Sequence, residues 1–138
     1  MHKILVTGGL GFIGSNLISM LLSQKYTVIN IDKVSYASNF YNTKSFSKNK
    51  NYKFIKCNIQ NKRKIDSILQ KFKPNGIFNL AAESHVDRSI DGPKCFIDSN
   101  ILGTFTLLES FKKYSSKFKN TKLIHISTDE VYGDVING

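Results

Sequence analysis

The chain has 138 residues, 41% hydrophobic and 22% charged, which is the composition of one soluble globular domain. No apolar run approaches the roughly 20 residues that cross a bilayer, and too few residues precede the first glycine for a signal peptide, so we expect a cytoplasmic protein without a membrane partner. The net charge of +10 comes mostly from lysine, whereas base readout favours arginine, so no nucleic-acid partner is expected. Cys57 and Cys95 lie far apart without a Cys/His cluster, so we predict neither a metal site nor a disulfide framework.

A glycine-rich stretch, TGGLGFIGSN, follows the first predicted strand at residues 3–7. Gly8, Gly11 and Gly14 fit the spacing G-x-x-G-x-x-G, and the second glycine of the opening pair gives the alternative G-x-G-x-x-G. Glycines at this spacing let a strand turn directly into a helix, expected here over residues 12–23. The first N–H groups of that helix then face a pyrophosphate, so the stretch predicts a dinucleotide-binding turn.

The second predicted strand, residues 27–31, ends at Asp32. A carboxylate at this place accepts hydrogen bonds from the hydroxyls of an adenosine ribose and repels a 2′-phosphate, which favours NAD over NADP. The neighbouring cation of Lys33 weakens that preference. Residues 33–51 are polar and rich in lysine, and we expect a long loop or a short helix there.

Strands are further expected over residues 52–57, 77–81 and 122–127, with helices over 62–72 and 93–114. Strands that alternate with helices predict a doubly wound α/β sheet of the Rossmann type, with parallel strands in the order 3-2-1-4-5 and ligands at their carboxyl ends. The long helix is expected to bury one apolar stripe, made of Phe96, Ile97, Ile101, Phe105, Leu108 and Phe111.

Two polar segments follow the fourth and fifth strands at this same edge. In HISTDEVYGD, Thr128 offers a hydroxyl and Asp129 and Glu130 are adjacent carboxylates, which suit an acid and a base if their environments differ, or else surface charge. In AAESHVDRSI, four ionisable groups suit either a ligand site or a structural ion-pair cluster, namely Glu83, His85, Asp87 and Arg88.

These motifs together resemble those of the extended short-chain dehydrogenase/reductases, and more narrowly the dTDP-glucose 4,6-dehydratase family. The glycine turn is shared by the whole superfamily, whereas LAAESHVDRSI combined with STDEVYGD is much narrower. The resemblance implies an NAD-dependent lyase that converts dTDP-glucose to dTDP-4-keto-6-deoxyglucose, as in rhamnose biosynthesis. Hydride passes from C4 of the glucose to NAD, water leaves across C5 and C6, and hydride returns to C6.

Two other functions stay open. A UDP-sugar 4-epimerase-like enzyme would keep the glycines and Asp32 but would not be expected to carry the adjacent carboxylates. A non-catalytic NAD-binding fragment is the second alternative. The resemblance also implies a homodimer for the full-length enzyme, with the long helix as its pairing surface.

The resemblance assigns roles to individual residues. Glu130 would remove the C5 proton, Asp129 would protonate the departing C6 hydroxyl, and Thr128 would hydrogen-bond the C4 oxygen. Substrate would be approached by Ser84 and Arg88 together with Thr128. The positions that match NAD contacts are Gly8, Gly11, Phe12, Ile13, Gly14, Asp32, Lys33, Val34, Ser35, Asn58, Ile59, Leu80, Ala81, Ala82, Glu83, Ser84 and Ser99.

The chain departs from the family pattern in three places. Asn58 stands where the family has Asp, so weaker NAD binding is expected, and Ser38 stands where the family has Gly. The family's Tyr-x-x-x-Lys pair belongs on a helix after the fifth strand, whereas Tyr52 and Lys56, which match the spacing, lie on the third predicted strand. We therefore expect residues 1–138 to be an NAD-binding domain that is truncated before that helix and before the substrate domain. Either the gene itself is truncated, or these residues are a piece of a longer chain. Alone, such a chain is expected to be inactive.

Overall fold

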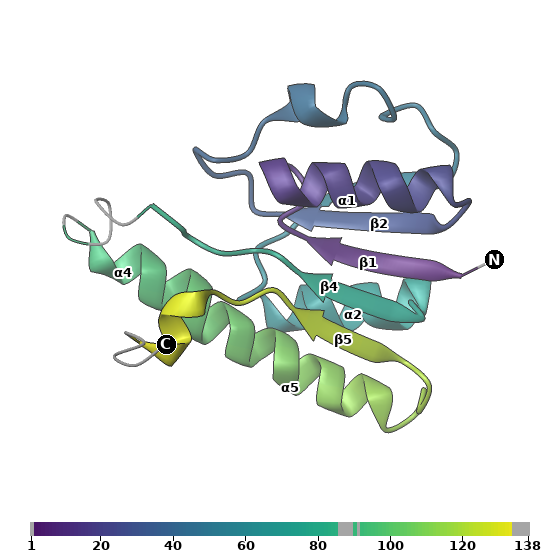
Figure 1. Ribbon diagram of the computed structural model, residues 1–138. Coiled ribbons are helices and arrows are strands. Elements are labelled where there is room, and N and C mark those ends of the chain that lie inside the picture. The colour runs from purple at the N-terminus through teal and green to yellow at the C-terminus, as the bar shows by residue number, and fades with distance from the viewer. Residues whose placement is uncertain (1, 86–89, 91, 134–138) are drawn as a thin grey trace.

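The computed structural model describes residues 2–85, 90 and 92–133, and of Asp129 and Glu130 it describes the backbone alone. Five parallel strands form one sheet in the order β3-β2-β1-β4-β5, which confirms the predicted Rossmann-type topology (Figure 1). The strands are β1 (Lys3–Thr7), β2 (Thr27–Asp32), β3 (Tyr52–Lys56), β4 (Gly76–Asn79) and β5 (Lys122–His125). The helices are α1 (Phe12–Ser23), η1 (Phe40–Thr43), α2 (Lys62–Phe72), α4 (Pro93–Phe96), η2 (Ile97–Gly103), α5 (Thr104–Ser115) and η3 (Asp129–Tyr132).

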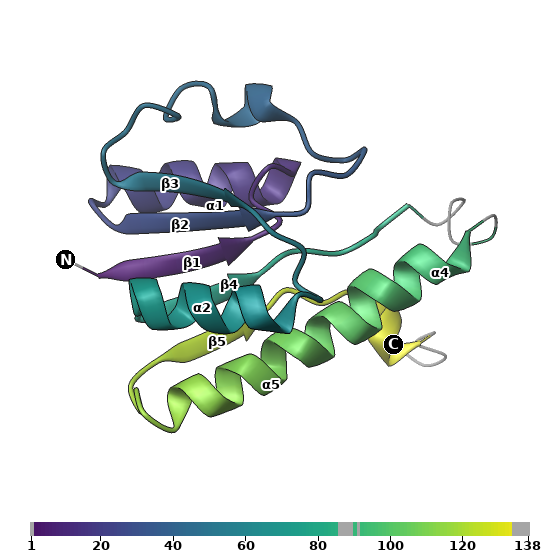
Figure 2. The ribbon, with the colours of Figure 1, turned by 180° about the vertical axis from the view of Figure 1, so that it is seen from behind.

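Helices cover the two faces of the sheet, with α1 on one face and α2 and α5 on the other (Figures 1 and 2). Because successive residues of a strand point to opposite faces, the apolar run of β1 serves both layers. Ile4 and Val6 pack in the cluster with α1, whereas Leu5 packs in the cluster with α2 and α5. The strand is therefore buried on both sides, as its continuous apolar sequence requires.

The outer strand β3 carries exposed lysines at Lys53 and Lys56. An edge strand has an unpaired row of backbone N–H and C=O groups, and charged side chains along it discourage pairing with another chain. Part of the lysine content of the chain is thus explained by the position of β3 at the edge of the sheet.

The long predicted helix is interrupted, because the π-helical η2 separates α4 from α5. The predicted buried stripe is wrong for most of its residues, since Ile101 is 61% and Phe105 62% exposed, whereas Phe111 is partly buried and packs against the core as predicted. Gly103 lies so close to Ile59 that a Cβ on it would be 2.7 Å from Ile59 Cγ1, so the inward face takes small side chains where it meets that residue. The buried residues of η2 and α5 are Ser99, Gly103, Leu107, Ser110 and Tyr114.

Three strands end earlier than the sequence predicts, β3 by one residue and β4 and β5 by two residues each. β4 stops at Asn79 and β5 at His125, although Ile126 N still donates to Asn79 O at 3.0 Å. After β4 and after β5 the chain therefore leaves the sheet at its carboxyl edge, and the two polar segments begin there. None of the described helices is long and apolar enough to pass through a membrane.

Candidate functional site

The glycine turn joins β1 to α1 at the carboxyl edge of the sheet. Gly8 has a φ of +70°, and a Cβ on it would lie 2.8 Å from Ala81 N, so the position excludes a side chain twice over. A Cβ on Gly14 would lie only 2.4 Å from Gly8 O. Both glycines are therefore required by the packing of the protein itself.

Gly11 differs from these two glycines. Its φ of −73° and ψ of 172° are ordinary extended values, and a Cβ there would meet only Gly8 O, at 3.3 Å. The backbone at Gly11 would therefore tolerate a side chain, at the cost of one tight contact with Gly8 O.

The first turn of α1 is suited to an anion. No described side chain caps the helix, and its first turn holds no acidic residue. The unpaired N–H groups and the positive end of the helix dipole therefore remain available to a negative ligand. Phe12 and Ile13 are 80% and 64% exposed, so two large apolar side chains flank this turn.

A partly buried hydrogen-bond network links the ends of three strands. Thr7 Oγ1 donates to Asn79 Oδ1 at 2.5 Å and accepts from Leu80 N at 3.2 Å and Ala81 N at 3.1 Å. Asn79 Nδ2 in turn lies 3.0 Å from His125 Nδ1. Thr7 and Asn79 were not predicted as site residues from the sequence. The pattern that could have indicated them is a polar residue at the end of an otherwise apolar strand. This network fixes the point at which the segment after β4 separates from the end of β1.

Asp32 is buried at the end of β2, with a 6% exposed fraction. Its Oδ1 accepts from Val34 N at 2.8 Å and from Ser38 Oγ at 2.7 Å, and its Oδ2 accepts from Leu10 N at 3.1 Å. A carboxylate has about four acceptor sites, so Oδ2 keeps room for one further donor. Ser38, the departure from the family's glycine, thus fixes the Asp32 carboxylate.

The loop after β2 carries a strained residue. Val34 has a φ of +63°, which is unusual for a β-branched side chain and is held by its N–H bond to Asp32. Ser35, the other predicted contact in this loop, donates its N–H to Ser38 Oγ at 3.0 Å. The loop is therefore organised around the Asp32 carboxylate.

Two of the predicted NAD contacts, Asn58 and Ile59, lie just beyond the end of β3. Asn58 Oδ1 accepts from Gln60 N at 3.0 Å, and Asn58 Nδ2 donates to Gln60 Oε1 at 3.1 Å. Gln60 Nε2 donates to Asp98 O at 2.6 Å, which joins this turn to η2. Ile59 is 5% exposed and packs in the core. The Asn58 amide is thus engaged within its own turn.

Three predicted cofactor contacts lie together. Lys33 Nζ is 2.5 Å from Glu83 Oε1 and 2.7 Å from Ser99 Oγ. The other contacts predicted after β4 follow the strand end: Leu80 and Ala81 are half-buried, whereas Ala82 and Ser84 are exposed. Together with the glycine turn and Asp32, these residues border one region at the carboxyl edge of the sheet.

The remaining predicted residues follow β5 or fall in the segment after Ser84. Thr128 is exposed, and its carbonyl accepts from Val131 N at 3.5 Å as η3 begins. Asp129 and Glu130 open η3, but the positions of their carboxylates lie outside what the structure describes. Arg88 also lies outside the described residues.

Tyr52 and Lys56 lie on β3, at the opposite edge of the sheet from β5. The Tyr52 hydroxyl accepts from Asn30 Nδ2 at 2.9 Å, and burial raises the pKa of Tyr52. The pair is thus separated by three strands from the segment that carries Thr128.

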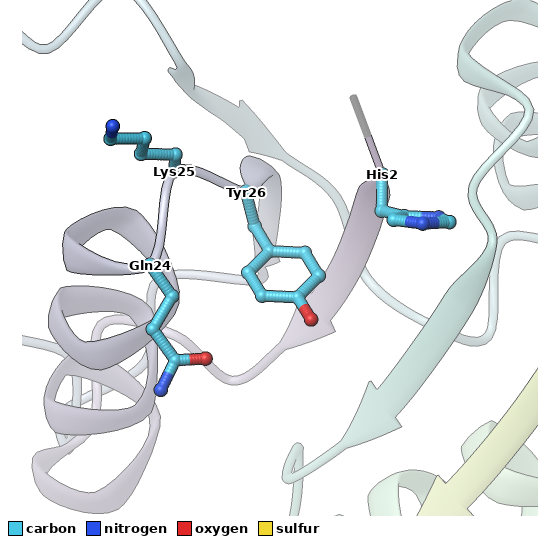
Figure 3. Close-up of a pocket in the computed structure, with 4 residues that line it drawn as sticks. All are labelled: His2, Gln24, Lys25 and Tyr26. Atoms are coloured by element: carbon cyan, nitrogen blue, oxygen red, sulfur yellow. The ribbon is translucent and has the colours of Figure 1, made fainter.

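A hollow of about 420 Å³ lies elsewhere, lined by His2, Gln24, Lys25 and Tyr26 (Figure 3). These residues flank the amino ends of β1 and β2. None of the predicted site residues lines it, so it is separate from the region described above.

A family model described as GDP-mannose 4,6 dehydratase matches residues 5–138. The chain belongs to this family. A dTDP-glucose 4,6-dehydratase of Salmonella typhimurium is 46% identical to it over 139 residues, which cover 96% of this chain and 38% of the relative. The chain therefore spans about two fifths of the length of that curated relative.

Solved structures of the same architecture include two sugar-nucleotide enzymes. A dTDP-glucose 4,6-dehydratase of Bacillus anthracis in complex with NAD has 40% identity and a TM-score of 0.82, covering 100% of this chain and 41% of that one. A UDP-glucose 4-epimerase of Thermotoga maritima with UDP-glucose has 34% identity and a TM-score of 0.84, covering 99% and 41%. The family model and the curated relative are both described as dehydratases, so the epimerase alternative is less supported.

Proposed function

We propose that this chain forms the NAD-binding part of a sugar-nucleotide 4,6-dehydratase that acts on dTDP-glucose. The observation that carries the proposal is Gly11, which lacks a side chain although its backbone is extended and a Cβ would meet only one atom, Gly8 O at 3.3 Å. A glycine that the fold itself does not require is explained by the close approach of a ligand backbone, as in dinucleotide sites. The relatives named as dTDP-glucose 4,6-dehydratases support this choice of reaction.

The residues present fit NAD. The uncapped first turn of α1 would receive the pyrophosphate, and the open acceptor site on Asp32 Oδ2 would take a ribose hydroxyl. Asn58 and Ile59 would border the adenine, with the amide weaker than the family's carboxylate as an acceptor. The segment after β4 would line the rest of the cofactor, through Leu80, Ala81, Ala82, Glu83 and Ser84.

The chemistry that bound NAD supplies is the acceptance of a hydride from the sugar and its later return. Glu130 would take the proton from C5, made acidic by the neighbouring C4 ketone, and Asp129 would give a proton to the departing C6 hydroxyl. Thr128 would donate a hydrogen bond to the C4 oxygen, where negative charge develops. Ser84 and Arg88 would contact the substrate. These roles rest on the resemblance in sequence.

We further propose that the full-length enzyme is a homodimer, paired through the outward apolar stripe of η2 and α5. Among the described residues, Ile97, Ile101, Leu102, Phe105 and Leu108 are each 43–62% exposed. Their spacing places most of them along one side of the helix. A contiguous apolar patch of this kind is unusual on a monomer surface, and a second copy of the same stripe is its natural partner.

A chimera tests the proposed reaction. The segment of the Salmonella relative that aligns with this chain would be replaced by these residues, leaving its remaining part unchanged. We expect the chimera to convert dTDP-glucose to a product that has lost one water, detected by mass spectrometry. Glu130→Gln should abolish the elimination, whereas Lys50→Met, an exposed lysine away from the site, should not.

The alternatives give different results. A product of unchanged mass with inverted C4 would support an epimerase. A folded chimera that binds NAD but forms no product would support a non-catalytic NAD-binding module. The 138 residues alone should bind NAD without turnover, because their one Tyr-x-x-x-Lys pair lies on β3.

A further inference from the structure

Lys33 joins three segments that are far apart in the sequence. It follows Asp32 at the end of β2, and its ammonium donates to Glu83 Oε1 at 2.5 Å and to Ser99 Oγ at 2.7 Å. Glu83 belongs to the segment after β4, and Ser99 belongs to η2. We call these three residues the Lys33 cluster.

Burial makes the Lys33 cluster energetically significant. The Glu83 side chain is 5% exposed and Ser99 is 7% exposed, whereas the Lys33 side chain keeps 32% of its surface in contact with solvent. A buried carboxylate without a cation close by is costly, and Lys33 is the cation that pairs with Glu83 among the described residues. Removal of the ammonium would leave that charge uncompensated, so the Glu83 side chain would move toward water.

The backbone of Glu83 is held from the same side. Glu83 N donates to Asn100 Oδ1 at 2.8 Å, and Asn100 Nδ2 donates to Glu83 O at 2.9 Å. Asn100 follows Ser99 in η2, so consecutive residues of this helix hold the main chain and the side-chain partner of Glu83. Because β4 ends at Asn79, strand pairing does not place this segment.

The position of this segment sets the shape of the proposed cofactor site. Ala81 N bonds to Thr7 Oγ1 at 3.1 Å and faces Gly8, where a Cβ would come within 2.8 Å. One end of the segment is therefore fixed against the glycine turn and the other against Lys33 and η2. A shift at Glu83 would move the wall opposite the turn.

We propose that Lys33 is a positioning residue, which holds the segment after β4 in its binding-competent place through Glu83 before the dinucleotide arrives. This deepens the proposed NAD function and rests on it. The competing role is direct: the Lys33 cation would contact the cofactor itself. The two roles predict different effects of removing the negative charge of Glu83. If Lys33 contacts the cofactor directly, its cation is released from the ion pair and NAD binding is kept or strengthened. If Lys33 acts through Glu83, the segment loses its anchor and NAD binding weakens.

A double-mutant cycle on NAD affinity separates these roles. The variants are Lys33→Met, Glu83→Gln and the double substitution, with Lys50→Met as the charge-matched control on an exposed lysine. We expect each single variant to weaken NAD binding about tenfold and the double variant to lose no more than the worse single variant, because coupled residues are not additive. Lys33→Arg should keep most of the affinity, and the control should stay within about twofold of wild type. Unchanged or tighter NAD binding by Glu83→Gln would overturn the proposal.

Amide hydrogen exchange in the unliganded chain is a second test of the positioning role of Lys33. The Glu83 N–H should exchange at least about tenfold faster in Lys33→Met, while the buried amide of Leu5 keeps its protection. Equal exchange at Glu83 in both proteins would contradict the proposal even if NAD binding changed. If the wild-type chain binds no NAD, the proposed function fails, and the exchange comparison still decides the role of Lys33. Should Lys33→Met not fold, Ser99→Ala removes one bond of the cluster and should show the same effects in smaller measure.

Discussion

Alanine at Gly14 is expected mainly to lower the stability of the chain, whereas alanine at Gly11 is expected mainly to weaken NAD binding. Both glycines belong to the same turn, so the two variants are matched controls for each other. The methyl of Gly14→Ala would lie 2.4 Å from Gly8 O and 2.8 Å from Gly9 Cα, whereas that of Gly11→Ala would approach only Gly8 O, at 3.3 Å.

The magnitudes follow from these distances. To reach an ordinary contact of 3.4 Å, α1 or the Gly8 peptide must move by about 1 Å in Gly14→Ala, because the obstructing atoms are backbone. Overpacking of this kind costs about 1–3 kcal/mol, partly offset by the better helix propensity of alanine. At roughly 3–5 °C per kcal/mol for a chain of this size, a net loss of about 1–3 kcal/mol should lower Tm by roughly 3–15 °C. Gly11→Ala should cost about 1 kcal/mol or less, since its extended backbone accepts alanine at the N-cap.

The binding effect should run the other way. In Gly11→Ala the methyl occupies the space through which a pyrophosphate would approach, so NAD affinity should fall at least about tenfold, or about 1.4 kcal/mol. Thermal unfolding by circular dichroism gives the stability, and equilibrium dialysis at a temperature where both variants are folded gives the affinity. Wild-type affinity in Gly11→Ala, or equal losses of Tm in the two variants, would refute this account of the turn.

Three further predictions test the packing of α5, the burial of a thiol and the proposed dimer. Leu107→Ala should destabilise the chain by about 2–5 kcal/mol in chemical unfolding and Leu108→Ala by about 0.5 kcal/mol or less, because Leu107 is buried and Leu108 is 43% exposed; equal losses would contradict the assigned helix face. Burial raises the pKa of the Cys57 thiol, so at pH 8 a thiol reagent should modify exposed Cys95 quickly and Cys57 slowly, and two equally fast thiols would be inconsistent with this. Phe105→Glu should halve the sedimenting mass if the apolar stripe pairs two copies, and an unchanged mass would place the interface elsewhere.

The sequence suffices to predict the elements that local pattern determines. Apolar spacing with a period of 3.6 residues predicted α1 and α2 with the bounds that the structure has, and alternation of strand and helix predicted the strand order. Handedness of parallel crossovers leaves few alternatives once the elements are known. The glycine turn and Asp32 were found for the same reason, since their spacing is local.

Contacts between distant segments were not predictable in this way. The apolar stripe with Ile101 and Phe105 was expected inside because apolar area favours burial, but Gly103 must lie against Ile59 and turns that stripe outward. The pairing of Lys33 with Glu83 joins residues 50 positions apart, which no periodicity encodes. Side chains at strand ends, such as Thr7, acquire their partners only when the sheet brings those ends together.

Equilibrium dialysis of the folded wild-type chain against NAD and NADP is the most direct test of the central claim, that the edge of the sheet around Gly11 and Asp32 binds NAD. NAD should bind saturably at one site. NADP should bind at least about tenfold more weakly, because the buried Asp32 carboxylate repels a 2′-phosphate. No NAD binding by a chain whose circular dichroism spectrum shows it to be folded, or tighter binding of NADP, would contradict the account.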